Sequence, residues 1–197
     1  MTASDVKIAG LLLAAGGSSR LGRPKQLVEM EGKTLIRRSA EALIEAGCSP
    51  LVVVLGAEVE GSVAELAGLD FEIVVNDEWN SGMSSSIRVG LPAINAAHAV
   101  LISLVDQPFV TGEKLQLLMD AFKGNSPDIV TAEYNGIAGV PAIFSSKLFP
   151  ALSTLKGDKG AREIIRNSPN ALTIPLPEAA TDVDFPDHLL SEFSGGT

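Results

Sequence analysis

The sequence contains very little cysteine and histidine, and this shortage removes several classes of site. Cys48 is the only cysteine in 197 residues, so neither an intrachain disulfide nor a thiolate zinc site can form. Cys48 lies just past a predicted helix, where we expect a buried structural thiol rather than a nucleophile. His98 and His188 belong to no cluster. We expect both histidines at the surface or in packing rather than as a base or a ligand.

Positive charge is also scarce. The formal net charge is -9 and the isoelectric point is about 4.7, which argues against a nucleic-acid surface because such a surface needs a basic stripe. The cations that exist gather at residues 20–25, 33–38 and 156–166. An acidic protein with local basic clusters suits a small anionic ligand.

Long hydrophobic runs are missing as well. No stretch reaches the roughly 18 apolar residues that a membrane span requires. The N-terminus carries Asp5 before its first apolar run and lacks a basic segment or a cleavage site, so we expect no signal peptide. The cytoplasm is therefore the expected compartment, with no membrane partner.

Apolar runs and amphipathic segments alternate along the chain. Runs at 6–14, 51–55 and 71–75 predict buried strands, and residues 34–46 and 58–67 predict the helices between them. This alternation predicts a parallel sheet with right-handed crossovers. Further strands are expected at 99–105, 128–132, 140–144 and 171–174, and further helices at 83–97 (interrupted by Pro92), 111–122, 146–152 and 187–193. No linker or repeat divides the chain, so we expect one domain over residues 1–197.

Pro141 lies inside one of these predicted strands. A proline cannot donate to a strand ladder, so we expect residues 140–144 at the edge of the sheet, or with their N–H groups facing a ligand.

A glycine-rich basic loop at 13–25 follows the first strand. Small residues let a backbone approach a ligand closely, and consecutive N–H groups can hold an anion, so this loop predicts a phosphate site. Gly17 and Gly22 have the spacing of a Walker A motif, but Arg23-Pro24-Lys25 replaces its Gly-Lys-Ser/Thr ending. The loop also lacks the dinucleotide fingerprint G-x-G-x-x-G.

The segment 76–87 places three serines and a glycine at the predicted start of a helix. One serine would suffice for N-capping, so we hold two interpretations open: a cap, or a polar pocket for a base or sugar. Trp79 in this segment either anchors the loop or stacks on a ligand, and anchoring is the simpler interpretation.

Carboxylates follow the later strands. Asp106 stands at the end of the strand 99–105, where open α/β sheets bind ligands, and it has no basic neighbour in the sequence. A divalent ion is a reasonable counter-charge, and an Asx turn or helix cap is the alternative. Asp184 either caps the last helix or is a second ligand for that ion, a role that Asp182 could also fill. A second glycine-rich basic loop, at 156–162, is by itself a weak signal for an anion site.

Six short motifs occur in a defined order along the chain. They are Leu-Ala-Ala-Gly-Gly-Ser-Ser-Arg-Leu-Gly-x-x-Lys at 13–25, Asn-x-x-Trp-x-x-Gly-Met-x-x-Ser-Ile at 76–87, Asp-Gln-Pro at 106–108, Gly-Val-Pro-Ala-Ile-Phe at 139–144, Gly-Asp-Lys-Gly-Ala-Arg at 157–162 and Asp-Val-Asp at 182–184. Together they resemble the MobA-like NTP transferases, and within them the molybdenum cofactor cytidylyltransferases, which attach CMP to molybdopterin.

The resemblance implies a single-domain, three-layer α/β/α nucleotide-binding fold of Rossmann-like type with a mostly parallel sheet. It implies transfer of CMP from CTP to the terminal phosphate of molybdopterin, with release of pyrophosphate. Catalysis would rest on Arg20 at the outer phosphates, Lys25 at the α-phosphate and Asp106. Asp106 and Asp184 would hold Mg²⁺.

By the same resemblance, the binding residues form two sets. The nucleotide would contact Leu13, Ala14, Ala15, Gly16, Gly17, Ser18, Arg20, Lys25, Asn76, Gly82, Ser85, Ser86 and Asp106. The acceptor would contact Gly139, Pro141, Ala142, Gly157, Asp158, Gly160 and Arg162.

The nucleobase and the acceptor have alternatives. Ala15 matches the cytidylyl enzymes, whereas guanylyl enzymes carry glycine there, so the resemblance favours CTP over GTP. The alternatives are the same chemistry with GTP or on a sugar, polyol or phospholactate phosphate, and a non-catalytic carrier of the molybdenum cofactor. A molybdenum hydroxylase that receives the product is the candidate protein partner, and we expect a monomer.

Overall fold

Strand β1 (Ile8–Ala14) is apolar throughout because it is covered on both faces. Its side chains alternate between two cores, as the two-residue period of a strand requires. Ile8 and Leu12 pack in one core, and Leu11 and Leu13 pack in the other. A strand of this kind belongs in the interior of a sheet rather than at its edge.

The computed structural model describes residues 6–17, 24–125, 127–158 and 160–182. Seven strands form one sheet in the order β5-β4-β1-β6-β8-β7-β9. The other six strands are β4 (Leu51–Leu55), β5 (Glu72–Val75), β6 (Ala99–Leu104), β7 (Ile129–Tyr134), β8 (Ile137–Ser145) and β9 (Leu172–Pro175). Only β8 runs antiparallel to its neighbours, so the predicted, mostly parallel sheet is confirmed. A two-stranded hairpin joins β2 (Glu29–Met30) and β3 (Lys33–Thr34).

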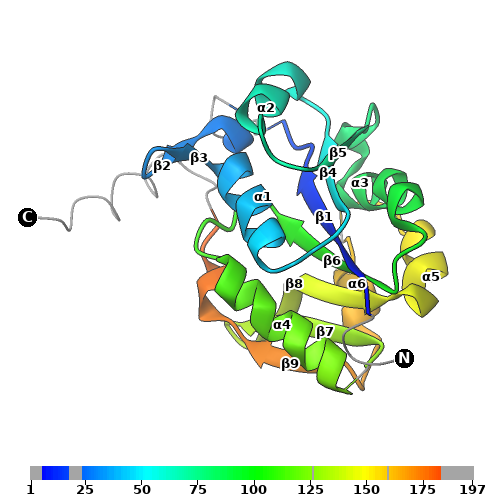
Figure 1. The fold of residues 1–197 in the computed structure, drawn as a ribbon. Helices are drawn as coiled ribbons and strands as arrows, with labels where there is room; N and C mark the ends of the chain where they lie inside the picture. Colours follow the sequence, from blue (N-terminus) through cyan, green and yellow to red (C-terminus); the bar gives the residue numbers. More distant parts are fainter. Residues whose placement is uncertain (1–5, 18–23, 126, 159, 183–197) are drawn as a thin grey trace, which may run out of the picture.

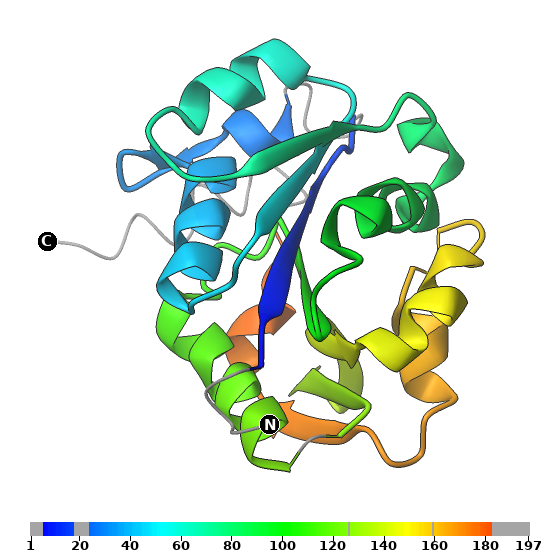
Figure 2. The ribbon, with the colours of Figure 1, turned by 45° about the vertical axis from the view of Figure 1, so that its right-hand side comes forward.

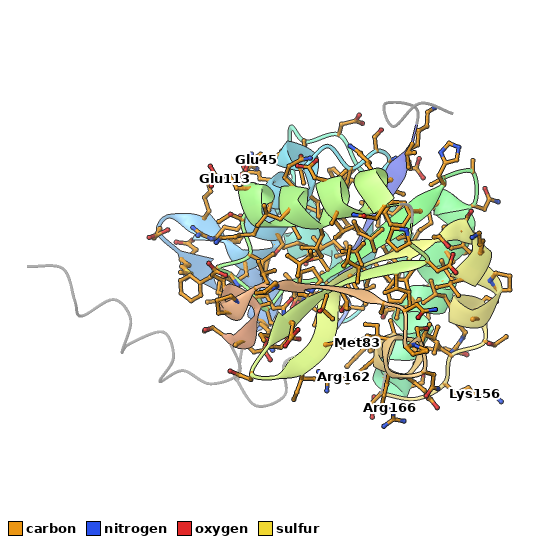
Figure 3. The ribbon with its side chains drawn as sticks, turned by 90° about the horizontal axis from the view of Figure 1, so that it is seen from below. Glu45, Met83, Glu113, Lys156, Arg162 and Arg166 are labelled. Carbon is orange, nitrogen blue, oxygen red and sulfur yellow. The ribbon has the colours of Figure 1, made fainter. Side chains whose placement is uncertain are left out.

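Helices cover both faces of the sheet. On one face lie α1 (Leu35–Glu45), α2 (Val59–Glu65) and α4 (Gly112–Asn125), and on the other lie α3 (Met83–Gly90), α5 (Phe149–Ser153) and α6 (Arg162–Arg166). Figure 2 shows β1 between these two groups. Figure 3 shows Glu45 and Glu113 on one side of the molecule and Arg162 and Arg166 on the other. The predicted three-layer α/β/α fold is confirmed.

One predicted helix ends early and another is divided in two, and in both cases a proline lies at the start of the following segment. The helix predicted at 83–97 stops at Gly90, and a 3-10 turn, η4 (Leu91–Ile94), begins with Pro92 in its first positions. The helix predicted at 146–152 divides into η5 (Ser146–Leu148) and α5, which has Pro150 in its first turn. Proline fits a first turn because the N–H that it lacks has no partner there. The remaining 3-10 turns are η2 (Lys25–Leu27), η3 (Trp79–Ser81) and η6 (Pro177–Ala180). The helix predicted at 187–193 lies outside the described residues.

Of the two interpretations offered for residues 140–144, the edge strand is wrong. β8 lies inside the sheet, between β6 and β7. The ladder with β7 shifts register between Thr131 and Ala132, whose partners are Ala142 and Gly139, so Val140 and Pro141 fall in the bulge. A bulge leaves a residue outside the ladder, which is where an interior strand can accommodate proline.

Cys48 is buried, as predicted, with its thiol beside Met119. Burial raises the pKa of the Cys48 thiol to about 12, partly offset by Lys123, so Cys48 is not a thiolate nucleophile near neutral pH. The exposed His98 accepts a hydrogen bond at Nδ1 from the backbone N–H of Lys7, which fits the surface role expected for it. None of the helices in the described part of the chain is long and apolar enough to cross a membrane.

Candidate functional site

The candidate site lies where the chain changes direction across the sheet. From β1 the chain adds β4 and β5 on one side, and then returns to add β6 on the other side of β1. The loops after β1 and β6 therefore diverge at the carboxyl ends of two adjacent strands, where open α/β sheets bind ligands. Gly16 and Gly17 follow β1, and Asp106 follows β6.

The fold joins two predicted catalytic residues across this point. Lys25 begins η2, and its Nζ lies 3.0 Å from Oδ2 of Asp106, 81 residues later in the sequence. Both side chains are partly buried. Asp106 thus has the cationic partner that its sequence neighbours do not supply. Its other oxygen, Oδ1, is buried and accepts no hydrogen bond from the described residues.

A cavity of about 440 Å³ opens beside this ion pair. Of the predicted nucleotide residues, those that line it are Leu13, Ala15, Gly16, Gly17, Lys25, Gly82, Ser86 and Asp106. Ala14, Asn76 and Ser85 are not among its lining residues, whereas Ser18 and Arg20 lie outside the described residues. The cavity thus collects groups from the loop at 13–25, the start of α3 and the end of β6.

Asn76 and Ser85 support the wall of this cavity from behind. Asn76 is buried, and its Nδ2 donates to Oγ of Ser85 at 2.8 Å and to Oγ of Ser86 at 3.0 Å. Its Oδ1 accepts from the backbone N–H of Glu78. Ser85 Oγ donates in turn to backbone carbonyls of the loop before α3. Because Ser86 lines the cavity, this network fixes a hydroxyl at its surface.

Trp79 closes another part of the same wall. It is 36% exposed and lines the cavity. A Cβ added to Gly17 would lie 2.6 Å from the ring of Trp79, and a Cβ added to Gly56 would lie 2.7 Å from the Cβ of Trp79. Trp79 therefore packs directly against two glycines. This packing agrees with the expected anchoring role, and the ring also faces the space available to a ligand.

A second, larger cavity of about 770 Å³ adjoins the first, and Met83, Leu104 and Asp158 line both. Of the predicted acceptor residues, Asp158 and Arg162 line it. The other predicted acceptor residues do not line it, although their neighbours Ala138, Val140 and Ala161 do. The residues that do not line it are Gly139, Pro141, Ala142, Gly157 and Gly160.

The loop at 156–162 is held against the start of α3. The backbone N–H of Ser84 donates to the carbonyl of Gly157 at 3.2 Å. Gly82 has a φ of 107°, and a Cβ there would collide with Asp158 and with the backbone of Gly157. Glycine at position 82 therefore brings two predicted motifs together at the junction of the cavities.

Several lining residues were absent from the sequence-based site. In the first cavity these are Gln26, Trp79, Asn80, Met83, Leu104 and Val105, and in the second they include Gln107, Tyr134, Ile137 and Arg166. Gln26 and Gln107 each follow a predicted site residue directly, which is a usable signal. Tyr134 reaches the cavity only through the pairing of β7 with β8, which periodicity does not reveal. Burial raises the pKa of Tyr134, so its hydroxyl stays protonated near neutral pH.

Among the described residues, no group of three or more acidic, histidine or cysteine side chains could hold a metal ion. Asp106 and Asp158 are the two carboxylates that line the first cavity, and Asp184, the second predicted ligand, lies outside the described residues. Asp182 lines the second cavity.

Residues 10–172 match the model of the MobA-like NTP transferase domain. The chain belongs to this family of nucleotidyltransferases. It is 36% identical, over 82% of its length and 83% of the relative, to nicotine blue oxidoreductase of Paenarthrobacter nicotinovorans. It is 23% identical, over 92% of its length and 93% of the relative, to molybdenum cofactor cytidylyltransferase of Escherichia coli.

Solved structures agree with the fold. The crystal structure of Rv0371c from Mycobacterium tuberculosis superposes with a TM-score of 0.84 at 28% identity and covers 96% of this chain and 99% of that one. A second structure of Rv0371c, in complex with manganese, has a TM-score of 0.79 at 27% identity and covers 97% of this chain and 100% of that one.

Proposed function

We propose that the protein transfers CMP from CTP to the terminal phosphate of molybdopterin and releases pyrophosphate. The observation that carries this proposal is the position of the Lys25–Asp106 pair beside a cavity that shares its wall with a second, larger one. Two adjoining cavities suit two substrates that must meet. The relative named for cytidylyl transfer to the molybdenum cofactor supports this choice of reaction.

The residues present fit a divalent metal ion at Asp106. Oδ1 of Asp106 is buried and accepts no hydrogen bond from the described residues, and a carboxylate oxygen is a preferred ligand of Mg²⁺. Asp184 is the proposed second ligand. When bound, Mg²⁺ would neutralise charge on the triphosphate. Rv0371c has been solved with manganese, which supports a divalent ion in this family.

The chemistry follows from charge. An oxygen of the acceptor phosphate forms a bond to the α-phosphorus of CTP in line with the leaving group, and the bond from that phosphorus to the bridging oxygen of pyrophosphate breaks. Both reactants are anions, so positioning and positive charge lower the barrier and no protein nucleophile is required. Lys25 would stabilise the charge that develops at the α-phosphate, with Arg20 at the outer phosphates.

CTP is the proposed nucleotide because a methyl group at Ala15 narrows the first cavity, which Ala15 lines. One methyl group contributes about 1–3 kcal/mol of discrimination, so neighbouring residues such as Ser86 must contribute the rest. The acceptor would occupy the second cavity, and a molybdenum hydroxylase would receive the product in the cytoplasm.

The test is pyrophosphate release with Mg²⁺, CTP or GTP, and molybdopterin. We expect Lys25→Ala and Asp106→Ala to lose about 100-fold or more of the rate, since one electrostatic contact to the transition state contributes about 3–4 kcal/mol. Lys147 and Asp128 provide a matched control, because they form a 2.9 Å ion pair that lines neither cavity. Lys147→Ala and Asp128→Ala should retain the rate of the unmodified protein. A normal Mg²⁺-dependent rate in Asp106→Ala would contradict the metal assignment, and turnover of a sugar phosphate but not molybdopterin would contradict the acceptor.

Oxidation–reduction is the second candidate, because a 36% identical relative is named an oxidoreductase. The loop after β1 lacks the G-x-G-x-x-G fingerprint of dinucleotide-binding folds, which disfavours a nicotinamide cofactor there. Oxidation of NADH or NADPH in the presence of a quinone dye, with no pyrophosphate release from CTP or GTP, would replace the first proposal by this one.

A further inference from the structure

Gln107 is a buried side chain that the proposed reaction leaves unused. It follows β6 directly after Asp106, is 3% exposed and lines the second cavity. Its Nε2 donates to the carbonyl oxygen of Val140 in β8 at 3.2 Å and to that of Ala179 in η6 at 2.9 Å. The amide therefore ties the strand that carries the bulge to the turn after β9.

These two bonds determine which way the amide points. A primary amide has two N–H donors, and both are used. Turning the amide over would place Oε1 against two carbonyl oxygens, so the orientation follows from its partners. Oε1 is then a fixed acceptor, and it is buried with no hydrogen-bond partner among the described residues.

An unpaired acceptor in a buried position is costly, so a retained one indicates a missing donor. The neighbouring Tyr134 side chain does not supply it, because in its contact with the Gln107 amide the hydroxyl oxygen of Tyr134 is the acceptor. The Tyr134 hydroxyl donates to the carbonyl oxygen of Val140 at 3.1 Å, which is the oxygen that also receives Nε2 of Gln107. We therefore expect the hydrogen-bond donor to Oε1 to come from a ligand bound in the second cavity.

We propose that Oε1 of Gln107 accepts a hydrogen bond from a ring N–H or amino group of the acceptor substrate, and so selects a heterocycle with such donors. This inference rests on the proposed function, in which molybdopterin is the acceptor. Its pterin ring is a 2-amino-4-oxo heterocycle, so a ring N–H and the adjacent amino group form an edge of hydrogen-bond donors. Arg162 and Arg166, which Figure 3 shows on the same side of the molecule, line the same cavity and would favour a ligand that also carries negative charge. Guanine presents the same donor edge, so the test must distinguish a pterin ligand from a guanine nucleotide.

The probe is pterin-6-carboxylate, which combines the donor edge with an anionic group and is itself fluorescent. Its binding to the full chain is measured by fluorescence anisotropy without nucleotide or metal. We expect Gln107→Met to weaken binding about tenfold, as the loss of one buried hydrogen bond does. The matched control is Thr131→Val, because Thr131 is buried, donates to the carbonyl oxygen of Gly139 in β8 at 2.6 Å and lines neither cavity. It removes a comparable bond to the same strand and should leave binding within twofold.

A modified ligand removes any dependence on stability. Methylation of the probe at N3 deletes one donor and crowds the adjacent amino group. We expect this to weaken binding to the unmodified protein about tenfold and binding to Gln107→Met less than threefold, because the lost contact is then already absent.

Each contrary outcome overturns the inference. These outcomes are no binding of the probe to the unmodified protein, an equal methylation penalty in both proteins, or an equal loss in Thr131→Val. Displacement of the probe by guanosine at equal concentration would assign the edge to a guanine nucleotide instead. Probe binding that depends on Gln107, without pyrophosphate release, would contradict the proposed function and leave the recognition role standing. Pyrophosphate release with molybdopterin that Gln107→Met leaves unchanged would contradict only the recognition role.

Discussion

At the scale of single residues, two adjacent glycines of the glycine-rich loop at 13–25 face different surroundings. A Cβ on Gly17 would lie 2.6 Å and 2.7 Å from two ring atoms of Trp79, whereas nothing lies within 4 Å of a Cβ on Gly16. Both residues line the first cavity. The position of the indole ring therefore depends on glycine at 17 but not at 16.

We predict that Gly17→Ala displaces Trp79, because contacts under 3.0 Å force a neighbouring atom to move. Trp79 is the only tryptophan, so the emission spectrum of the protein reports on this ring alone. Its emission maximum should shift in Gly17→Ala, and the dissociation constant for CTP should rise about tenfold, since one wall of the cavity is disturbed.

Gly16→Ala is the control for the ring position. Its emission spectrum should match that of the unmodified protein. An unchanged spectrum in Gly17→Ala would mean that the ring does not rest on Gly17, and an equal shift in both variants would mean that the loop, not the ring, had moved.

The sequence identified Lys25 and Asp106 individually but could not reveal their ion pair. They are 81 positions apart, and the segment between them includes the five strands β2 to β6 and the helices α1, α2 and α3, so their proximity is a property of the sheet order. Gly82 and Ser86 were likewise named as site residues by the family resemblance, whereas the support that Asn76 gives to Ser86 depends on a side-chain network. Gln107 was overlooked because an unpaired atom is visible only after its partners are known.

At the scale of elements, α1 shows why the helices were easier to predict than the later strands. Ile36, Ala40 and Leu43 follow the helical period, and all three are buried against the sheet. Ile44, the next residue, is 36% exposed. A period repeated over about two turns identifies both the helix and its buried face.

We predict that Leu43→Ala lowers the free energy of unfolding by about 2–5 kcal/mol, because it removes buried methyl groups and leaves a cavity. Ile44→Ala, the adjacent control, should cost about 1 kcal/mol or less because part of its side chain is already in contact with water. Urea unfolding followed by circular dichroism measures both. Equal losses in the two variants would mean that α1 presents a different face to the sheet.

β8 is the element whose position the sequence predicted wrongly. Pro141 indicated an edge strand, because a proline cannot donate to a ladder. The register shift opposite Thr131 and Ala132 places the proline where no ladder bond is required. A bulge depends on two strands together, so the sequence of one strand cannot reveal it.

At the scale of the whole molecule, ligands that bind the native state should raise the melting temperature by mass action. We predict that CTP with Mg²⁺, at about 100 times its dissociation constant, adds about 2.7 kcal/mol of stability and so raises the melting temperature by several degrees. GTP should give a smaller shift. Differential scanning fluorimetry measures both.

Lys25→Ala should lose most of this shift, and Lys147→Ala, whose ion pair with Asp128 lines neither cavity, should keep it. A larger shift with GTP than with CTP would reverse the nucleotide assignment. The same shift in Lys25→Ala and in the unmodified protein would remove Lys25 from the nucleotide site.

The order of strands in the sheet also has a consequence for biosynthesis. A ribosome releases β1, β4 and β5 first, and these can pair as a parallel set while the opposite edge of β1 is still bare. Only when β6 emerges and pairs with that edge does Asp106 arrive beside Lys25. A nascent chain that ends before residue 106 therefore carries the glycine-rich loop without its carboxylate. If the loop and Asp106 form the proposed nucleotide site, the nascent chain can complete that site only after this second half has been made.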